Sequence, residues 1–383
     1  MNTNEVHGRL SYLDGARGLA SFCVLIHHFF MLVYPTFLYQ GLDLNIQSEL
    51  VVLMAHTPLG IWCDGNFAVT FFFVLSGFVL FYSYEEYKLS TLITLIKACL
   101  RRYIRLTLPI IAVCFATFVL LKLNLVYSFQ ADSLNKEKWI GKFLLTNYSW
   151  YDVIIQAAYE NYINFKNSKT FSPVLWTIGV ELKGSFIVFT LIYLKKYIKP
   201  NWLKILIFLA LSIYSMNTYY LCIFFGVLIA FIKKNKTILS HFKKFQWLYL
   251  LGFIYLGGVR DLDHPLYAWF KMISTDKYSH LLTFKIIGSV CLMLLLITNS
   301  KIQCVLQKNV FLYIGKLSYS LYLTHFLILI TLGSYLHLNA SIFVNFCIST
   351  VLAMLTAHLF NFLIDAPSIR ISKGLFNRRV NKL

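Results

Sequence analysis

Long apolar stretches recur along the whole chain, and their length limits the possible folds more than any other feature. A helix needs about 20 predominantly apolar residues to cross a hydrocarbon core of about 30 Å. Backbone groups inside lipid must pair with one another, and these stretches lack the strict alternation of barrel strands, so they indicate helices. The sequence predicts an all-α, polytopic membrane protein with about ten transmembrane helices, near 12–34, 66–84, 104–122, 173–194, 203–216, 218–232, 245–259, 281–298, 310–332 and 340–364.

Charged residues are few and lie mainly in alternate loops. Hydrophobic residues make up 58% of the chain and charged residues 13%, against about 25% charged in a soluble domain. Most of the 35 Lys and Arg residues fall on one side of the ten predicted spans. The positive-inside rule assigns that side, and with it both termini, to the cytoplasm of a multi-pass protein in the inner (plasma) membrane.

The net charge of +19 therefore reflects membrane orientation, and we expect membrane lipids but no nucleic acid as partners. Eight cysteines are scattered without a CxxC pair, a pattern that predicts neither a metal site nor a disulfide framework. We expect a single membrane-embedded domain over residues 1–383, with no appended soluble domain.

The first span carries three polar side chains, Asp14, Arg17 and His28. Ionisable groups inside a membrane are costly and indicate a functional site. Arg17 and His28 are eleven positions apart, close to three helical turns, so both face the same way. His27 points about 100° away from that face, whereas Asp14 lies one turn before Arg17 and is placed to pair with it.

Five motifs, in this order, resemble the acyltransferase 3 family of integral membrane acyltransferases across nearly the whole chain. The family's opening motif has an Arg and a His separated by ten residues, as Arg17 and His28 are. The final span is followed by Asp365, Ala366 and Pro367, where the family commonly has Glu-Pro. The matching segments are LDGARGLASFCVLIHHF, FFFVLSGFVL, RRYIRLTLP, SPVLWTIGVEL and GKLSYSLYLTHF.

The resemblance implies an O-acyltransferase that moves acyl groups, usually acetyl, onto bacterial cell-envelope glycans. The expected donor substrate is acetyl-CoA, with no bound cofactor, and the expected acceptor is a surface polysaccharide, such as capsule or lipopolysaccharide, or its lipid-linked precursor. Two alternatives stay open, a glycolipid transporter or flippase without enzymatic activity, and an acyltransferase for a small molecule.

His28 is the predicted general base, because a neutral imidazole titrates near physiological pH and a sugar hydroxyl needs deprotonation. The family resemblance implies the same role. A packed histidine is the alternative. Arg17 is predicted to position the donor or stabilise oxyanion charge, with Asp14 orienting it; snorkelling to lipid headgroups is the alternative.

Three further polar residues lie inside predicted spans. Glu181 is a candidate catalytic residue, either orienting His28 or Arg17 or forming a structural pair, and we expect another helix to supply its partner. Ser76 has an orienting role or, with Gly77, allows two helices to approach closely. His325 is predicted to orient the site or to make a polar contact between helices.

Arg101, Arg102 and Arg105 form a basic cluster at the predicted cytoplasmic end of the third span. Arginine side chains bind phosphate groups well, and a CoA donor carries several. The cluster is therefore a candidate donor site, with a topology and headgroup signal as the alternative.

Two predicted external segments, 35–65 and 123–172, are longer than simple connections. The second holds Trp139, Trp150 and several Tyr residues among amides and carboxylates. Such a composition suits carbohydrate binding, and interfacial anchoring is the alternative.

Overall fold

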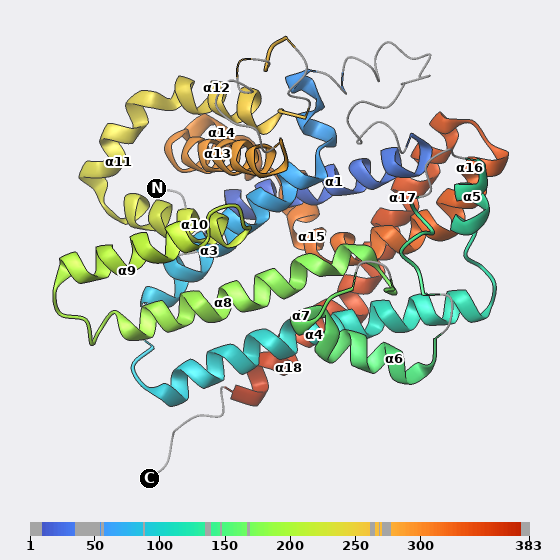
Figure 1. Cartoon of the computed structure of the whole chain (residues 1–383), viewed down its shortest axis with the longest axis horizontal. Helices are drawn as coiled ribbons and strands as arrows, with labels where there is room; N and C mark the ends of the chain where they lie inside the picture. Colours follow the sequence, from blue (N-terminus) through green and yellow to red (C-terminus); the bar gives the residue numbers. More distant parts are fainter. Residues whose placement is uncertain are drawn as a thin grey trace. The chain divides into compact units, whose positions relative to one another are not determined.

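A computed structural model describes residues 10–34, 54, 57–86, 89–134, 139–145, 148–166, 169–260, 265–267, 269 and 277–376. These residues are almost all helical (Figure 1). Within them, the one β-type pairing is an isolated bridge between Leu144 and Thr170. The all-α prediction is therefore confirmed for the part of the chain that the structure describes.

Seven of the described helical stretches are long and apolar enough to cross a membrane. They are Ser11–Val33, Gly65–Tyr84, Leu92–Lys122, Pro173–Leu194, Leu281–Thr298, Asn309–Asn339 and Ile342–Leu375.

The other three predicted spans are also helical, but they are shorter. They are α9 (Asn201–Tyr214), α10 (Tyr220–Lys234) and α12 (Gln246–Gly257), with 14, 15 and 12 residues. At about 1.5 Å per residue, each is shorter than a hydrocarbon core of about 30 Å. A membrane protein is thus supported, and the count of ten stays a prediction.

The chain divides into two units. Unit 1 comprises residues 1–27, 36–89 and 187–316, and unit 2 comprises residues 28–35, 90–186 and 317–383. Three of the boundaries fall inside helices, namely α1 (Ser11–Val33), α8 (Trp176–Leu194) and α15 (Asn309–Ile328).

In unit 1, α3 (Gly65–Glu86), α10 and α13 (Lys277–Thr298) pack against one another, and α12 packs on α13. Glycines set the closeness of α3 and α10. A Cβ added to Gly77 would lie 2.1 Å from the carbonyl oxygen of Ile223, and one added to Gly226 would lie 2.0 Å from that of Val74. The prediction that Gly77 allows two helices to approach closely is therefore confirmed. The remaining elements of this unit are η3 (Pro58–Cys63), α11 (Lys236–Phe242), η6 (Lys243–Phe245) and α14 (Ser300–Leu306).

In unit 2, α4 (Leu92–Lys122) packs against α6 (Trp150–Ile155), η4 (Gln156–Glu160), η9 (Asn361–Asp365) and α18 (Ala366–Phe376). The Tyr103 hydroxyl donates to the carbonyl of Ala158 at 2.8 Å, and the hydroxyls of Thr107 and Tyr162 lie 2.8 Å apart. Other elements of unit 2 are α5 (Ser128–Leu134), α7 (Asn161–Ile163), η5 (Pro173–Leu175), η8 (Leu329–Gly333), α16 (Ser334–Asn339) and α17 (Ile342–Phe360).

Candidate functional site

His28 and His325 form a histidine pair in unit 2, although 297 residues separate them in sequence. Nδ1 of His28, near the end of α1, lies 3.1 Å from Nε2 of His325 on α15. The ring centroids are 5.0 Å apart. His325 is fully buried. The predicted contact of His325 with another helix is therefore present, and its partner is the predicted general base.

The hydrogen bonds of the pair set its tautomers. Nδ1 of His325 lies 2.9 Å from the carbonyl oxygen of Leu321, and a carbonyl only accepts, so Nδ1 carries the proton. Nε2 of the neutral ring is then an acceptor, and Nδ1–H of His28 donates to it. In this arrangement Nε2 of His28 carries a lone pair, which a general base requires.

Two tyrosines fix the helix that carries His325. The Tyr319 hydroxyl donates to the carbonyl of Leu106 on α4 at 3.3 Å. The Tyr322 hydroxyl donates to the carbonyl of Val174 at 2.8 Å and lies 2.7 Å from the Thr177 hydroxyl. The segment SYSLYLTH thus anchors α15 to two other parts of unit 2, which orients the histidine at its end.

Aromatic rings surround the imidazole of His28. The Trp139 ring lies 5.5 Å away, centroid to centroid, at an interplanar angle of 32°. Phe326 meets the imidazole edge-on at 6.3 Å. These rings restrict the orientation of His28, which is half-buried.

Glu181 is paired with Arg102. The Arg102 guanidinium donates to the Glu181 carboxylate through Nη2 and to the Ser185 hydroxyl through Nε at 3.1 Å. The Arg102 side chain is only 12% exposed. The partner of Glu181 on another helix is therefore Arg102, which the sequence analysis assigned to donor binding. The positive charge of Arg102 is already offset by this carboxylate.

The other predicted site residues lie on α1, α3 and α4. In unit 1, Nη2 of Arg17 donates to Oδ1 of Asp14 at 2.8 Å, which confirms the expected pairing. Ser76 lies on α3, half-buried. Arg101 and Arg105 are half-buried on α4 of unit 2.

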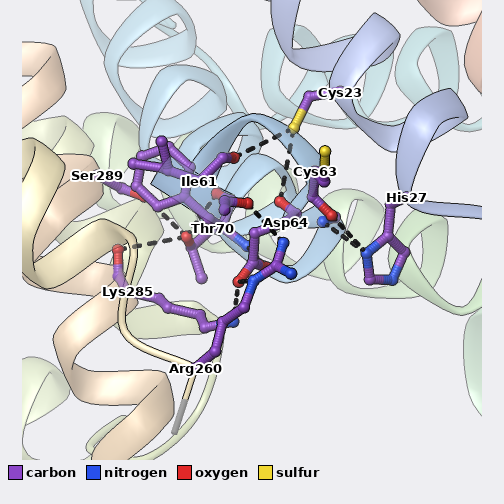
Figure 2. Close-up of polar contacts among 12 residues, drawn as sticks. Cys23, His27, Ile61, Cys63, Asp64, Thr70, Arg260, Lys285 and Ser289 are labelled. Carbon is purple, nitrogen blue, oxygen red and sulfur yellow. Dashed lines mark hydrogen bonds and ion pairs between the residues drawn. The ribbon is translucent and has the colours of Figure 1, made fainter. Parts of the chain in front are cut away.

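A buried ionic cluster in unit 1 was not predicted from the sequence (Figure 2). Nζ of Lys285, on α13, donates to Oδ2 of Asp64 at 2.5 Å. Nε of Arg260 lies 3.4 Å from the same oxygen, and Nη2 of Arg260 donates to the carbonyl of Gly60 at 2.5 Å. Oδ1 of Asp64 accepts from the backbone N–H of Phe67 at 2.9 Å and so caps the start of α3.

The surroundings of Asp64 favour its charged form. Burial by itself raises the pKa of a carboxyl group, but the charges of Lys285 and Arg260 outweigh burial and lower the pKa of Asp64 to about 2. The sequence did contain one signal for this cluster, because Lys285 is a charged residue inside an apolar span.

His27 belongs to the surroundings of this cluster and not to the histidine pair. Its Nδ1 lies 3.0 Å from the backbone nitrogen of Gly65 and 3.1 Å from the carbonyl oxygen of Cys63 (Figure 2). Neighbouring histidines on α1 therefore have different partners, as the helical period predicts.

A family model described as an acyltransferase domain matches residues 10–361. No curated protein and no solved structure matches the chain.

Proposed function

Because the chain belongs to the acyltransferase 3 family, we propose that it is a membrane O-acyltransferase with His28 as general base. The proposed donor is cytoplasmic acetyl-CoA or another short acyl-CoA. The proposed acceptor is a hydroxyl group of a surface polysaccharide or its lipid-linked precursor. The observation that carries the choice of His28 is its hydrogen bond to His325, since this bond leaves a lone pair on Nε2 of His28.

In the proposed reaction, Nε2 of His28 takes the proton of the hydroxyl group of the acceptor substrate. The oxygen of that hydroxyl group bonds at the same time to the carbonyl carbon of the thioester. The carbon–sulfur bond then breaks, and the departing thiolate takes the proton back from His28. The products are an O-acyl ester and CoA thiol, and His28 returns to its neutral tautomer. His325 accepts the Nδ1–H bond throughout and keeps the imidazole oriented.

The remaining roles follow the family resemblance. We propose that Arg17, held by Asp14, positions the donor or stabilises developing oxyanion charge. Arg101 and Arg105 are assigned to the CoA phosphates, while the contact of Arg102 with Glu181 supports a structural role for that pair. Ser76 keeps an orienting role in this proposal.

We also propose that α9, α10 and α12 complete ten spans in the inner membrane, with both termini cytoplasmic. The charge distribution of the loops supports this orientation. Reporter fusions within 130–165 should report the external side, and fusions near 90, 235 and 375 the cytoplasmic side. An internal signal from residue 150 would contradict the ten-span topology.

The direct test of the function compares envelope glycans by NMR in cells that express the wild-type chain and in cells that lack it. We expect O-acetyl signals that depend on the chain. Unchanged acyl content with altered glycan export would contradict the proposal and favour a glycolipid transporter.

A further inference from the structure

Asp132 organises the backbone of a short segment in unit 2. One carboxylate oxygen, Oδ1, accepts from the N–H groups of Trp139 at 3.2 Å and Ile140 at 3.0 Å. The other, Oδ2, accepts from the N–H of Gly141 at 2.8 Å. Asp132 is 5% exposed. A buried carboxylate that accepts three consecutive backbone donors fixes their conformation strongly.

The element that carries Asp132 is itself attached to the helix of His325. Asp132 lies on α5, which packs against η8 and α16, the direct continuation of α15. The N–H of Tyr127, just before α5, donates to the carbonyl of Ile330 in η8 at 2.9 Å. The position of Trp139 is therefore set from the same helical stretch that sets the position of His325.

The Trp139 ring is placed against His28 by this segment. The indole also makes edge contacts with Phe143 at 5.6 Å and Phe326 at 6.4 Å. Its centroid lies 5.5 Å from that of the imidazole, at an interplanar angle of 32°. A cation within about 6 Å of an indole face is attracted by the ring's negative quadrupole.

We propose that Trp139 stabilises the imidazolium that forms when His28 takes the acceptor's proton, and that Asp132 is the positioning residue that holds Trp139 there. The proposal rests on the proposed function, because the imidazolium arises only if His28 acts as the base. It adds two residues, Asp132 and Trp139, to the machinery of that reaction.

The first arm of the test examines the position of the Trp139 ring next to His28 without measuring enzymatic activity. The protonated form of histidine quenches the emission of a tryptophan that it contacts, so the emission is compared at acidic pH. We expect His28→Ala to raise the emission of the purified full chain, and we expect no such rise in the Trp139→Phe background. Asp132→Leu should abolish the quenching as well, because the Leu side chain accepts none of the three backbone N–H groups of residues 139–141. Asp152→Leu is the matched control, because Asp152 is a half-buried capping carboxylate on α6 of the same unit.

The second arm measures kcat and KM separately. Trp139→Leu should lower kcat about 2- to 30-fold, the range of a cation–π contact, with KM for donor and acceptor unchanged. Trp139→Phe should recover part of the loss, because Phe keeps an aromatic face. Asp132→Leu should lower kcat in the same range. Trp202→Leu is the matched control, because Trp202 is 66% exposed and lies on α9 of unit 1.

The two arms separate this proposal from the proposed function. If His28→Ala leaves the Trp139 emission unchanged, the placement is wrong and the proposal fails even in an active enzyme. If His28→Ala is inactive but Trp139→Leu keeps its kcat, the proposal fails and the proposed function stands. If His28→Ala is fully active, the proposed function fails first, whatever the fluorescence shows.

Discussion

Nδ1 of His28 lies 3.1 Å from Nε2 of His325, and this contact joins the first described helix to one near the end of the chain. A histidine whose Nδ1–H donates to a fixed acceptor presents Nε2 in one orientation. In the proposed reaction, His325 holds the imidazole of His28 in one orientation and one tautomer.

Replacing His325 by Phe should lower kcat by about 5- to 150-fold, the effect of leaving a buried hydrogen-bonding group without its partner. The ring volume is kept, but the acceptor for Nδ1–H of His28 is lost. Steady-state acyl transfer by the purified chain measures the effect. His358→Phe, on α17, is the control. Full activity in His325→Phe would show that the pair is a packing contact.

The three arginines of the cluster should respond differently to substitution with Gln. Arg101→Gln and Arg105→Gln are expected to raise KM for acetyl-CoA about 10- to 150-fold, because a charged hydrogen bond contributes about 1.5–3 kcal/mol. Arg102→Gln should instead lower thermal stability, since it leaves Glu181 without its guanidinium contact. A second change, Glu181→Gln, should restore part of that stability. If neither Arg101→Gln nor Arg105→Gln changes KM, these two arginines serve topology alone.

Lys285→Met should lower the free energy of unfolding by about 3–5 kcal/mol, because it removes a cation from a buried ion pair and leaves the carboxylate of Asp64 less well compensated. Denaturant titration in detergent measures this quantity. Adding Asp64→Asn should recover part of the loss, since the buried charge is then removed too. Lys301→Met, at an exposed position, is the control. Equal stability of Lys285→Met and the wild type would contradict the role of the cluster.

The low pKa of Asp64, about 2, links stability to pH. The ordinary value in an unfolded chain is about 3.9, so the folded state favours the ionised carboxylate. Its contribution is complete above about pH 4 and is lost as the pH falls toward 2. We expect the stability difference between the wild type and Asp64→Asn to shrink by about 1 kcal/mol from pH 6 to pH 3. A constant difference would contradict the lowered pKa.

The helical fold was predictable because each apolar run is long enough to impose a helix in lipid. Parts of the site were predictable for a related reason. A buried charge needs a partner, so Glu181 had to meet another helix, although the sequence did not show that the partner is Arg102. The contact between His28 and His325 joins helices far apart in sequence, and periodicity gives only the face of each helix and not its neighbour.

Other features lacked a periodic signal altogether. Asp132 acts through backbone groups of a loop, and no spacing rule links a carboxylate to the N–H groups of residues 139–141. Lys285 did have a signal, as a cation within an apolar span, but its partner Asp64 lies outside any span, before α3.

The central claim is that His28, and not its neighbour, performs the chemistry. The most direct measurement compares acyl transfer from labelled acetyl-CoA by purified His28→Ala and His27→Gln at equal protein level. We predict that His28→Ala loses activity by about 100- to 10,000-fold, as expected for a missing general base. His27→Gln should stay active, because a Gln oxygen can still accept from the backbone of Gly65. Full activity in His28→Ala, or a selective loss in His27→Gln, would contradict the account.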